Sequence, residues 1–254
     1  MGDGAIIQIR GLRNQFGDQI IHDNLDLDVR RGEVLGVVGG SGTGKSVLLR
    51  TIVGLNRPRA GTIRVFGEDI TAMDDVERMR IQQRWGVLFQ DGALFSSLTV
   101  AQNVEVPFKE HTVLKRDVIE ELAAIKVDLV GLPPEAGGKF PSELSGGMRK
   151  RAGLARALAL DPEIIFLDEP TAGLDPIGAA AFDQLIRNLQ QSLGLTVFMV
   201  THDLDSLAAI CDRIAVLIDK RVIVDTMANL MKVNQPWIQE YFHGPRGRAA
   251  LAGR

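Results

Sequence analysis

Eight consecutive residues match the phosphate-binding loop G-x-x-x-x-G-K-[ST] at every fixed position. They are Gly39, Gly40, Ser41, Gly42, Thr43, Gly44, Lys45 and Ser46. Glycines let the backbone turn tightly and aim N–H groups inward, so such a loop can hold a β-phosphate at the N-terminus of a helix. Lys45 would bridge the β- and γ-phosphates, and the Ser46 hydroxyl would ligate Mg²⁺. The pattern predicts a nucleoside triphosphate site, and the alternative is a Gly-rich turn that binds nothing.

Polar side chains also follow three other predicted strands, at the point where each strand ends. Gln90 follows residues 85–89, Asp168 and Glu169 follow 163–167, and His202 follows 196–200 after one threonine. Ligands of open parallel sheets bind at the carboxyl ends of the strands. We therefore expect these four side chains to lie beside the phosphate loop.

Together these residues supply the groups that transfer of a phosphoryl group to water requires. The reaction needs phosphate donors, a divalent metal, a group that activates the water and a group that neutralises charge on the γ-phosphate. Ser46, Gln90 and Asp168 would hold Mg²⁺, and Gln90 would also contact the water. Glu169 would act as the general base, and His202 would contact the γ-phosphate. Singly, each residue could be structural; as a set they predict catalysis.

The elements that must position these residues follow from the hydrophobic pattern. Alternation over residues 5–35 predicts antiparallel β-structure, and apolar runs predict buried parallel strands. Helices are expected at 45–53, 74–84, 117–130, 145–160 and 177–192, short strands at 34–38, 61–67, 85–89, 163–167 and 196–200, and sheet-edge strands at 214–218 and 221–224. The prediction is an α/β fold with a central, mainly parallel sheet, an antiparallel β subdomain and a helical subdomain inserted at about 92–160. One domain would span residues 1–240, followed by a C-terminal tail, 241–254.

Two features of this layout carry further expectations. Ser145 is placed to cap the helix over 145–160. Four basic residues of that helix are expected to form its solvated face: Arg149, Lys150, Arg151 and Arg156. Phe16 lies in a turn before the phosphate loop, where it could stack on a nucleotide base or anchor the turn.

Composition restricts the class of protein. The 254 residues carry a net charge of −3, with 45% hydrophobic and 24% charged residues, so no global field favours nucleic acid. The single cysteine, Cys211, excludes an internal disulfide and is expected in the core. No apolar stretch approaches the roughly 20 residues of a membrane-spanning helix, and the start has no signal-peptide layout. We expect any membrane role to come through a partner.

The motifs, in their order and spacing, resemble the ATP-binding subunits of ABC transporters across nearly the whole chain. They are GGSGTGKS, Gln90, LSGGM at 144–148, IIFLDEP at 164–170, AGLD at 172–175 and His202. The resemblance implies that two copies sandwich two ATP molecules head to tail. Ser145, Gly146 and Gly147 would then cap the γ-phosphate held by the other copy. It also implies that Phe16 stacks on adenine, that Asp175 belongs to the loop coupling the two sites, and that the segment after Gln90 contacts a membrane permease.

The sequence resembles one branch of this family most closely, the ATPases of Mla-type, MCE-linked phospholipid transporters. LSGGM followed by Arg149-Lys150-Arg151-Ala152, with the segment 86–95 upstream, carries this resemblance. Met148 departs from the commoner glutamine, but the serine hydroxyl and backbone amides do not depend on it. The resemblance implies permease subunits and an MCE-type lipid-binding protein as partners. It also implies a place on the cytoplasmic face of the bacterial inner membrane, and transport of phospholipid between inner and outer membranes.

Three alternatives remain at this point. The chain could serve another importer, for amino acids or another small solute. It could be a non-transport ABC protein, but it has neither long coiled-coil insertions nor a second ATPase domain. A small-molecule kinase with a phosphate loop would leave LSGGM and His202 unexplained.

Overall fold

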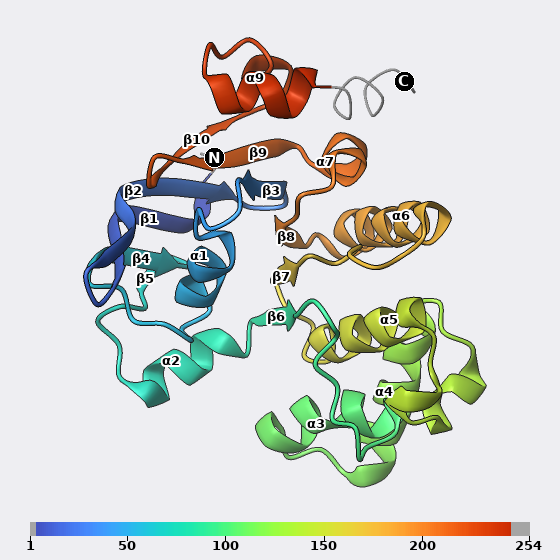
Figure 1. Cartoon of the computed structure of the whole chain (residues 1–254). Helices are drawn as coiled ribbons and strands as arrows, with labels where there is room; N and C mark the ends of the chain where they lie inside the picture. Colours follow the sequence, from blue (N-terminus) through green and yellow to red (C-terminus); the bar gives the residue numbers. More distant parts are fainter. Residues whose placement is uncertain (1–3, 245–254) are drawn as a thin grey trace.

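The computed structural model describes residues 4–244, which form two sheets surrounded by helices (Figure 1). The first sheet is antiparallel, with the order β2-β1-β4-β5. Its strands are β1 (Ala5–Phe16), β2 (Gln19–Arg30), β4 (Ala60–Val65) and β5 (Glu68–Asp69). The alternation over residues 5–35 therefore predicted the antiparallel pair correctly.

The second sheet has six strands in the order β10-β9-β3-β8-β7-β6. They are β3 (Val34–Gly39), β6 (Trp85–Leu88), β7 (Ile164–Asp168), β8 (Thr196–Val200), β9 (Arg213–Ile218) and β10 (Arg221–Asp225). All neighbours pair in parallel except β9 and β10. Of the two strands expected at a sheet edge, only β10 lies at one: the expectation of an edge position for 214–218 was wrong, because β9 lies between β10 and β3.

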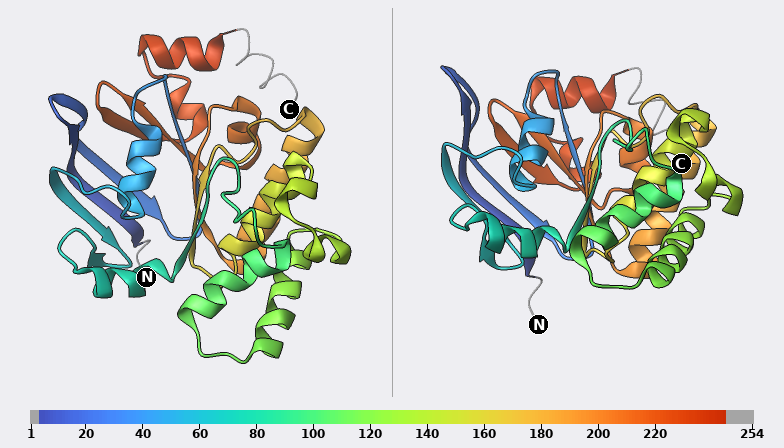
Figure 2. Two further views of the ribbon diagram at one scale, coloured as in Figure 1. Left: turned by 60° about the horizontal axis from the view of Figure 1, so that its bottom comes forward. Right: turned by 90° about the horizontal axis from the view of Figure 1, so that it is seen from below.

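Nine α-helices and two 3₁₀ helices are present in residues 4–244. They are α1 (Lys45–Ile52), α2 (Asp75–Gln82), α3 (Val100–His111), α4 (Arg116–Leu129), η1 (Pro134–Gly138), η2 (Pro141–Glu143), α5 (Gly146–Ala157), α6 (Pro176–Leu193), α7 (Leu204–Ile210), α8 (Met227–Leu230) and α9 (Pro236–His243). Helices α3, α4 and α5 form a group at one side of the molecule (Figures 1 and 2). Helices α7, α8 and α9 have no counterpart among the predicted elements. The tail residues 245–254 lie outside the described part of the chain. No helix of residues 4–244 is long and apolar enough to cross a membrane.

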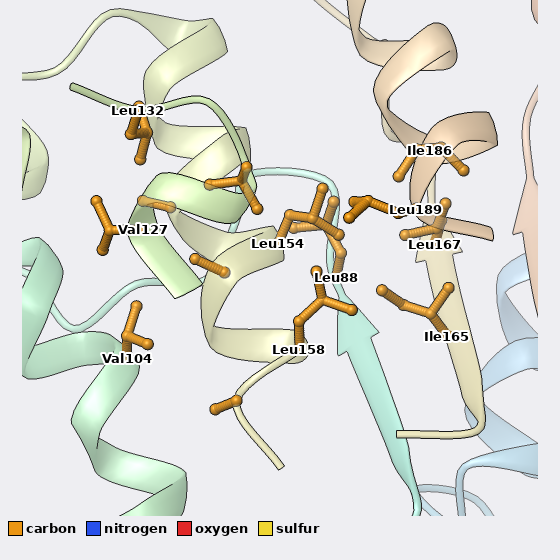
Figure 3. Packing of buried hydrophobic residues seen from close by; sticks show 14 of the residues in the cluster. Leu88, Val104, Val127, Leu132, Leu154, Leu158, Ile165, Leu167, Ile186 and Leu189 are labelled. Carbon is orange, nitrogen blue, oxygen red and sulfur yellow. The ribbon is translucent and has the colours of Figure 1, made fainter. Parts of the chain in front are cut away.

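The parallel sheet is covered on both faces. In β7, Ile164 and Phe166 pack into the cluster that holds α1 and the antiparallel sheet, whereas Ile165 and Leu167 pack against the helical side. Figure 3 shows Ile165 and Leu167 beside Ile186 and Leu189 of α6, with Leu154 of α5 and its C-cap residue Leu158 nearby. This two-sided burial explains the nearly continuous apolar runs of the central strands.

Candidate nucleotide site

The phosphate loop joins β3 to α1, as the sequence predicts. Gly44 caps α1 in the left-handed region, with φ 94°. A Cβ at this position would lie 2.6 Å from His22 Nε2 and would also meet the Ile21 side chain, so only glycine fits. The free N–H groups at the start of α1 therefore lie at the end of a short glycine turn, where an anion can bind.

Lys45 folds its side chain back over the loop. Its Nζ donates hydrogen bonds to the carbonyl oxygens of Gly39, at 2.9 Å, and Gly40, at 3.2 Å. Burial lowers the pKa of Lys45, and the nearby carboxylates of Glu169 and Asp168 oppose this shift. The ammonium group thus lies between the glycine loop and the acidic strand end, where it can reach bound phosphate oxygens.

Ser46 and Asp168 bring two oxygen groups together from different elements. Ser46 Oγ, in the first turn of α1, lies 3.5 Å from Asp168 Oδ1 at the end of β7. Burial raises the pKa of Asp168, and the Glu169 carboxylate raises it further. Hydroxyl and carboxylate oxygens suit Mg²⁺, which binds one or two protein oxygens and takes the rest from phosphates and water. Residues 4–244 contain no group of three acidic, histidine or cysteine side chains that could hold a metal ion unaided.

Glu169 and His202 form a hydrogen-bonded pair at the ends of β7 and β8. The two side chains are 2.7 Å apart between Glu169 Oε2 and His202 Nδ1. His202 is exposed, whereas the Glu169 side chain is mostly buried. The Glu169 backbone adopts a φ of 51°, a left-handed conformation that costs a non-glycine residue about 1–3 kcal/mol. With Nδ1–H donating to the carboxylate, the imidazole Nε2 is left able to contact another group.

Gln90 is exposed and lies two residues beyond the end of β6. Its backbone carbonyl is bound by Lys150, a residue that the sequence analysis placed on a solvated face. Lys150 Nζ donates to the carbonyl oxygens of Gln90, at 3.0 Å, and Glu169, at 3.1 Å. The side chain of Lys150 therefore ties the ends of β6 and β7 to α5. It is only 6% exposed, so its assignment to a solvated face was wrong.

Arg156 was misplaced in the same way. Its guanidinium donates to the carbonyl oxygens of Gly92 and Ala93, in the segment after β6. Burial lowers its pKa. The helical spacing of these basic residues indicated a polar face. Their actual partners are backbone carbonyl oxygens, which need donors but cannot be recognised from the pattern of residue types.

The LSGGM segment forms the start of α5. Ser145 caps the helix by accepting a hydrogen bond from the Met148 N–H at 3.2 Å, as predicted. Ser145 and Gly146 are exposed, and Gly147 is half-buried. Within residues 4–244, no hydrogen bond joins this segment to the phosphate loop of the same chain. Free N–H groups at such an exposed helix N-terminus can bind an anion.

Two other predicted site residues lie at the ends of their own elements. Asp175 caps α6, accepting from the N–H groups of Ile177 and Gly178 at 3.1 and 3.0 Å. Phe16 ends β1 and is 51% exposed, so its ring remains available for stacking. Hydrogen bonds pair Ser46 with Asp168 and Glu169 with His202, while Lys45 bonds to the loop carbonyls. Phe16, Ser145 and Asp175 lie outside these hydrogen bonds.

A buried polar group behind the phosphate loop escaped sequence analysis. His22 of β2 is fully buried, and its Nδ1 lies 3.0 Å from Asn14 Nδ2. Asn14 Oδ1 in turn lies 3.4 Å from the Thr51 hydroxyl of α1. Because the Asn14 amide donates to Nδ1, the His22 proton is placed on Nε2, which faces Gly44. Alternating apolar residues around His22 marked a strand, but no motif marked this histidine.

The family model described as ABC transporter matches residues 22–172, more than half of the chain. The chain belongs to the ABC transporter family. It is an ATPase subunit that binds ATP, with the α/β fold of ABC cassettes, as the sequence predicted.

Three relatives show how the match extends. The probable ribonucleotide transport ATP-binding protein mkl of Mycobacterium leprae is 41% identical over 244 residues, covering 96% of this chain and 70% of the relative. The intermembrane phospholipid transport system ATP-binding protein MlaF of Escherichia coli is 38% identical over 240 residues, covering 94% and 89%. The methionine import ATP-binding protein MetN of Lacticaseibacillus paracasei is 39% identical over 227 residues, covering 88% and 64%.

A solved structure shows the same fold. The ATP-binding cassette MJ0796, solved as a dimer in a post-hydrolysis state bound to ADP and Pi, superimposes with a TM-score of 0.79 at 31% identity. The match covers 87% of this chain and 98% of MJ0796.

Proposed function

We propose that this chain is the ATP-hydrolysing subunit of a transporter that moves phospholipid between the inner and outer membranes of a bacterium. The observation that carries this proposal is the match to MlaF, which spans 94% of this chain and 89% of that relative. The MetN match leaves about a third of that relative uncovered, since it covers 64%. Because MetN still matches most of this chain, an importer of methionine or another solute is the second candidate. The name of the mkl relative describes a third cargo, ribonucleotides.

In the hydrolytic site, we assign a separate task to each residue. Ser46, Gln90 and Asp168 hold Mg²⁺, which neutralises phosphate charge when bound. Lys45 contacts the β- and γ-phosphates. Glu169 polarises the attacking water, and His202 contacts the γ-phosphate through Nε2 while Nδ1 holds the Glu169 carboxylate. The 2.7 Å contact between these two side chains supports the last assignment.

We assign the exposed start of α5 to the ATP site of a second copy. Ser145, Gly146 and Gly147 then complete a site whose phosphate loop belongs to the partner subunit, in a twofold dimer. The dimeric structure of MJ0796 supports this arrangement. Asp175 and Phe16 keep their expected roles, at the loop between the two sites and at adenine.

The permease is expected to dock in a groove on the side of the chain that carries α2, α3 and β6. The groove has a volume of about 360 Å³, and its lining includes Met79, Phe95, Pro107 and His111. Phe95 is 52% exposed, and Met79 is 49% exposed. A groove with both apolar and polar lining beside the segment 92–108 suits a short amphipathic helix. The subunit would thus lie on the cytoplasmic face of the inner membrane, with an MCE-type protein elsewhere in the complex.

One experiment tests the cargo. The full chain would be tagged, extracted from native membranes in mild detergent, and its bound proteins and lipids identified by mass spectrometry. A multi-spanning permease with an MCE-domain protein and phospholipid is the expected result. A permease with a solute-binding protein for amino acids or another solute would overturn the lipid proposal, and recovery without any membrane protein would overturn the transporter role.

A variant tests the docking groove in the same preparation. Phe95→Glu places a charge in the groove, so it should reduce recovery of the permease at least about ten-fold, as expected when a central apolar anchor is lost. Ile125→Glu is the matched control, because Ile125 is 54% exposed on α4, outside the groove. Equal permease recovery by both variants would contradict docking at this groove.

A further inference from the structure

Helix α9 packs against elements that adjoin the nucleotide site. Its residues Ile238 and Phe242 are fully buried in a cluster that includes Val38, the strand residue before the phosphate loop, and Leu207 of α7. Helix α7 begins two residues after His202. Figure 1 shows α9 packed over the side of the sheet that carries β9 and β10. This helix therefore rests on the elements that carry the phosphate loop and His202.

Two aromatic side chains of α9 reach the site itself. The Tyr241 hydroxyl donates a hydrogen bond to the backbone carbonyl oxygen of His202, at 3.1 Å. Trp237 stacks on Tyr241, with ring centroids 4.7 Å apart and planes 13° apart. Trp237 also lies against the phosphate loop, because a Cβ on Gly40 would lie 3.4 Å from its Nε1.

The Tyr241 hydroxyl keeps the proton that it donates in this hydrogen bond. Burial raises the pKa of its hydroxyl above the ordinary value, and nearby acidic groups add to the shift. The hydroxyl therefore stays protonated. His202, by contrast, lies in an irregular segment between β8 and α7, with its side chain exposed. Without a backbone anchor, such a side chain would lose orientation easily.

We infer that Tyr241 is a positioning residue for His202, holding its backbone so that Nδ1 stays in contact with Glu169. Trp237 supports the Tyr241 ring from the side of the phosphate loop. The inference rests on the proposed catalytic roles of Glu169 and His202. It assigns the C-terminal helix a part in ATP hydrolysis that neither the motifs nor the matched segment 22–172 contain.

The first test is Tyr241→Phe in the full chain, because this change removes the hydroxyl and keeps the stacked ring. We expect kcat for ATP hydrolysis to fall about five-fold, which is the effect of losing one hydrogen bond, while KM for ATP changes less than about two-fold. Glu240→Ala is the matched control, since its side chain is exposed on the same helix. A kcat within about two-fold of the parent would overturn the inference.

A double variant shows whether Tyr241 acts through His202. If it does, adding Tyr241→Phe to His202→Ala causes no further loss of turnover beyond that of His202→Ala. Independent, multiplying losses would overturn the inference. If His202→Ala alone leaves turnover unchanged, the catalytic role of His202 fails instead, and the two failures are distinguishable.

A spectroscopic test does not depend on turnover. The chain has four histidines, so isotope-labelled imidazole signals can be resolved by NMR and that of His202 identified with His202→Ala. Tyr241→Phe should shift the His202 signals and leave that of the buried His22 in place. Unmoved His202 signals would show that Tyr241 only packs α9, and would overturn the inference.

Discussion

At the scale of single residues, Glu169 is the group whose chemistry can be removed with the least change of shape. Glu169→Gln replaces a carboxylate that can accept a proton with an amide of the same size. We expect ATP hydrolysis to fall at least about 100-fold, the usual contribution of a general base. ATP should still bind and hold a dimer, because Lys45 and the phosphate loop are intact. Phosphate release and the mass in solution with ATP measure the two effects.

A matched substitution controls for loss of one negative charge. Glu121→Gln changes an exposed glutamate of α4, and it should hydrolyse ATP like the parent. If Glu169→Gln also turned over at that rate, Glu169 would not be the base.

His22 makes a prediction about stability and pH. Burial lowers its pKa to about 4, whereas the unfolded chain titrates near 6.5. Between these values the unfolded chain binds the extra proton, so His22 lowers stability as pH falls from about 6.5 toward 4, by up to about 3 kcal/mol. Urea unfolding of His22→Gln should therefore show a smaller loss between pH 7 and 5 than the parent. An equal loss in both proteins would contradict a buried neutral histidine.

Asp183 has the opposite effect on how stability depends on pH. The effect of His22 must therefore be taken from the difference between the parent and His22→Gln. Burial raises its pKa to about 6, and its carboxyl takes up a proton in the folded chain first. Its contribution to stability therefore increases as pH falls through 6. Subtracting the parent's pH profile from that of His22→Gln removes this shared term.

At the scale of elements, the close approach of β6 and α5 depends on a glycine. A Cβ on Gly86 would meet the Ala157 carbonyl oxygen and backbone. Gly86→Ala should lower the free energy of unfolding by about 2 kcal/mol, a typical cost of overpacking. Gly138→Ala is the control, because a Cβ there meets no atom within 4 Å. Equal urea midpoints for Gly86→Ala and Gly138→Ala would show that β6 and α5 can move apart without loss of stability.

The same elements show what the sequence can reveal. Strands β3, β7 and β8 were predictable because burial on both faces leaves continuous apolar runs, and the phosphate loop because its backbone needs glycine. Helix α9 was missed because its apolar residues are few and find their partners in elements distant in sequence, among them β3, α7 and β9. Lys150 was misread because its partners are backbone carbonyls, which every residue carries.

At the scale of the whole molecule, the proposed dimer can be tested by mixing two inactive variants. Lys45→Ala damages the phosphate loop, and Ser145→Arg blocks the start of α5. If the site joins these parts from different copies, a mixed dimer contains one intact site and one doubly damaged site. Random mixing should then restore up to about one quarter of the parent's ATP turnover. Mixtures as inactive as the separate variants would indicate that both parts act within one chain.

The strand order of the six-stranded sheet has a consequence for how the protein is made. Strand β3, which leads into the phosphate loop, is synthesised long before its sheet neighbours β8 and β9, because most of the described chain lies between them. The antiparallel pair β1 and β2 is complete much sooner and can form locally. A chain emerging from the ribosome therefore carries its glycine loop long before the strands that hold it in place exist. The growing polypeptide can complete the sheet around β3 only after β8 and β9 have been synthesised.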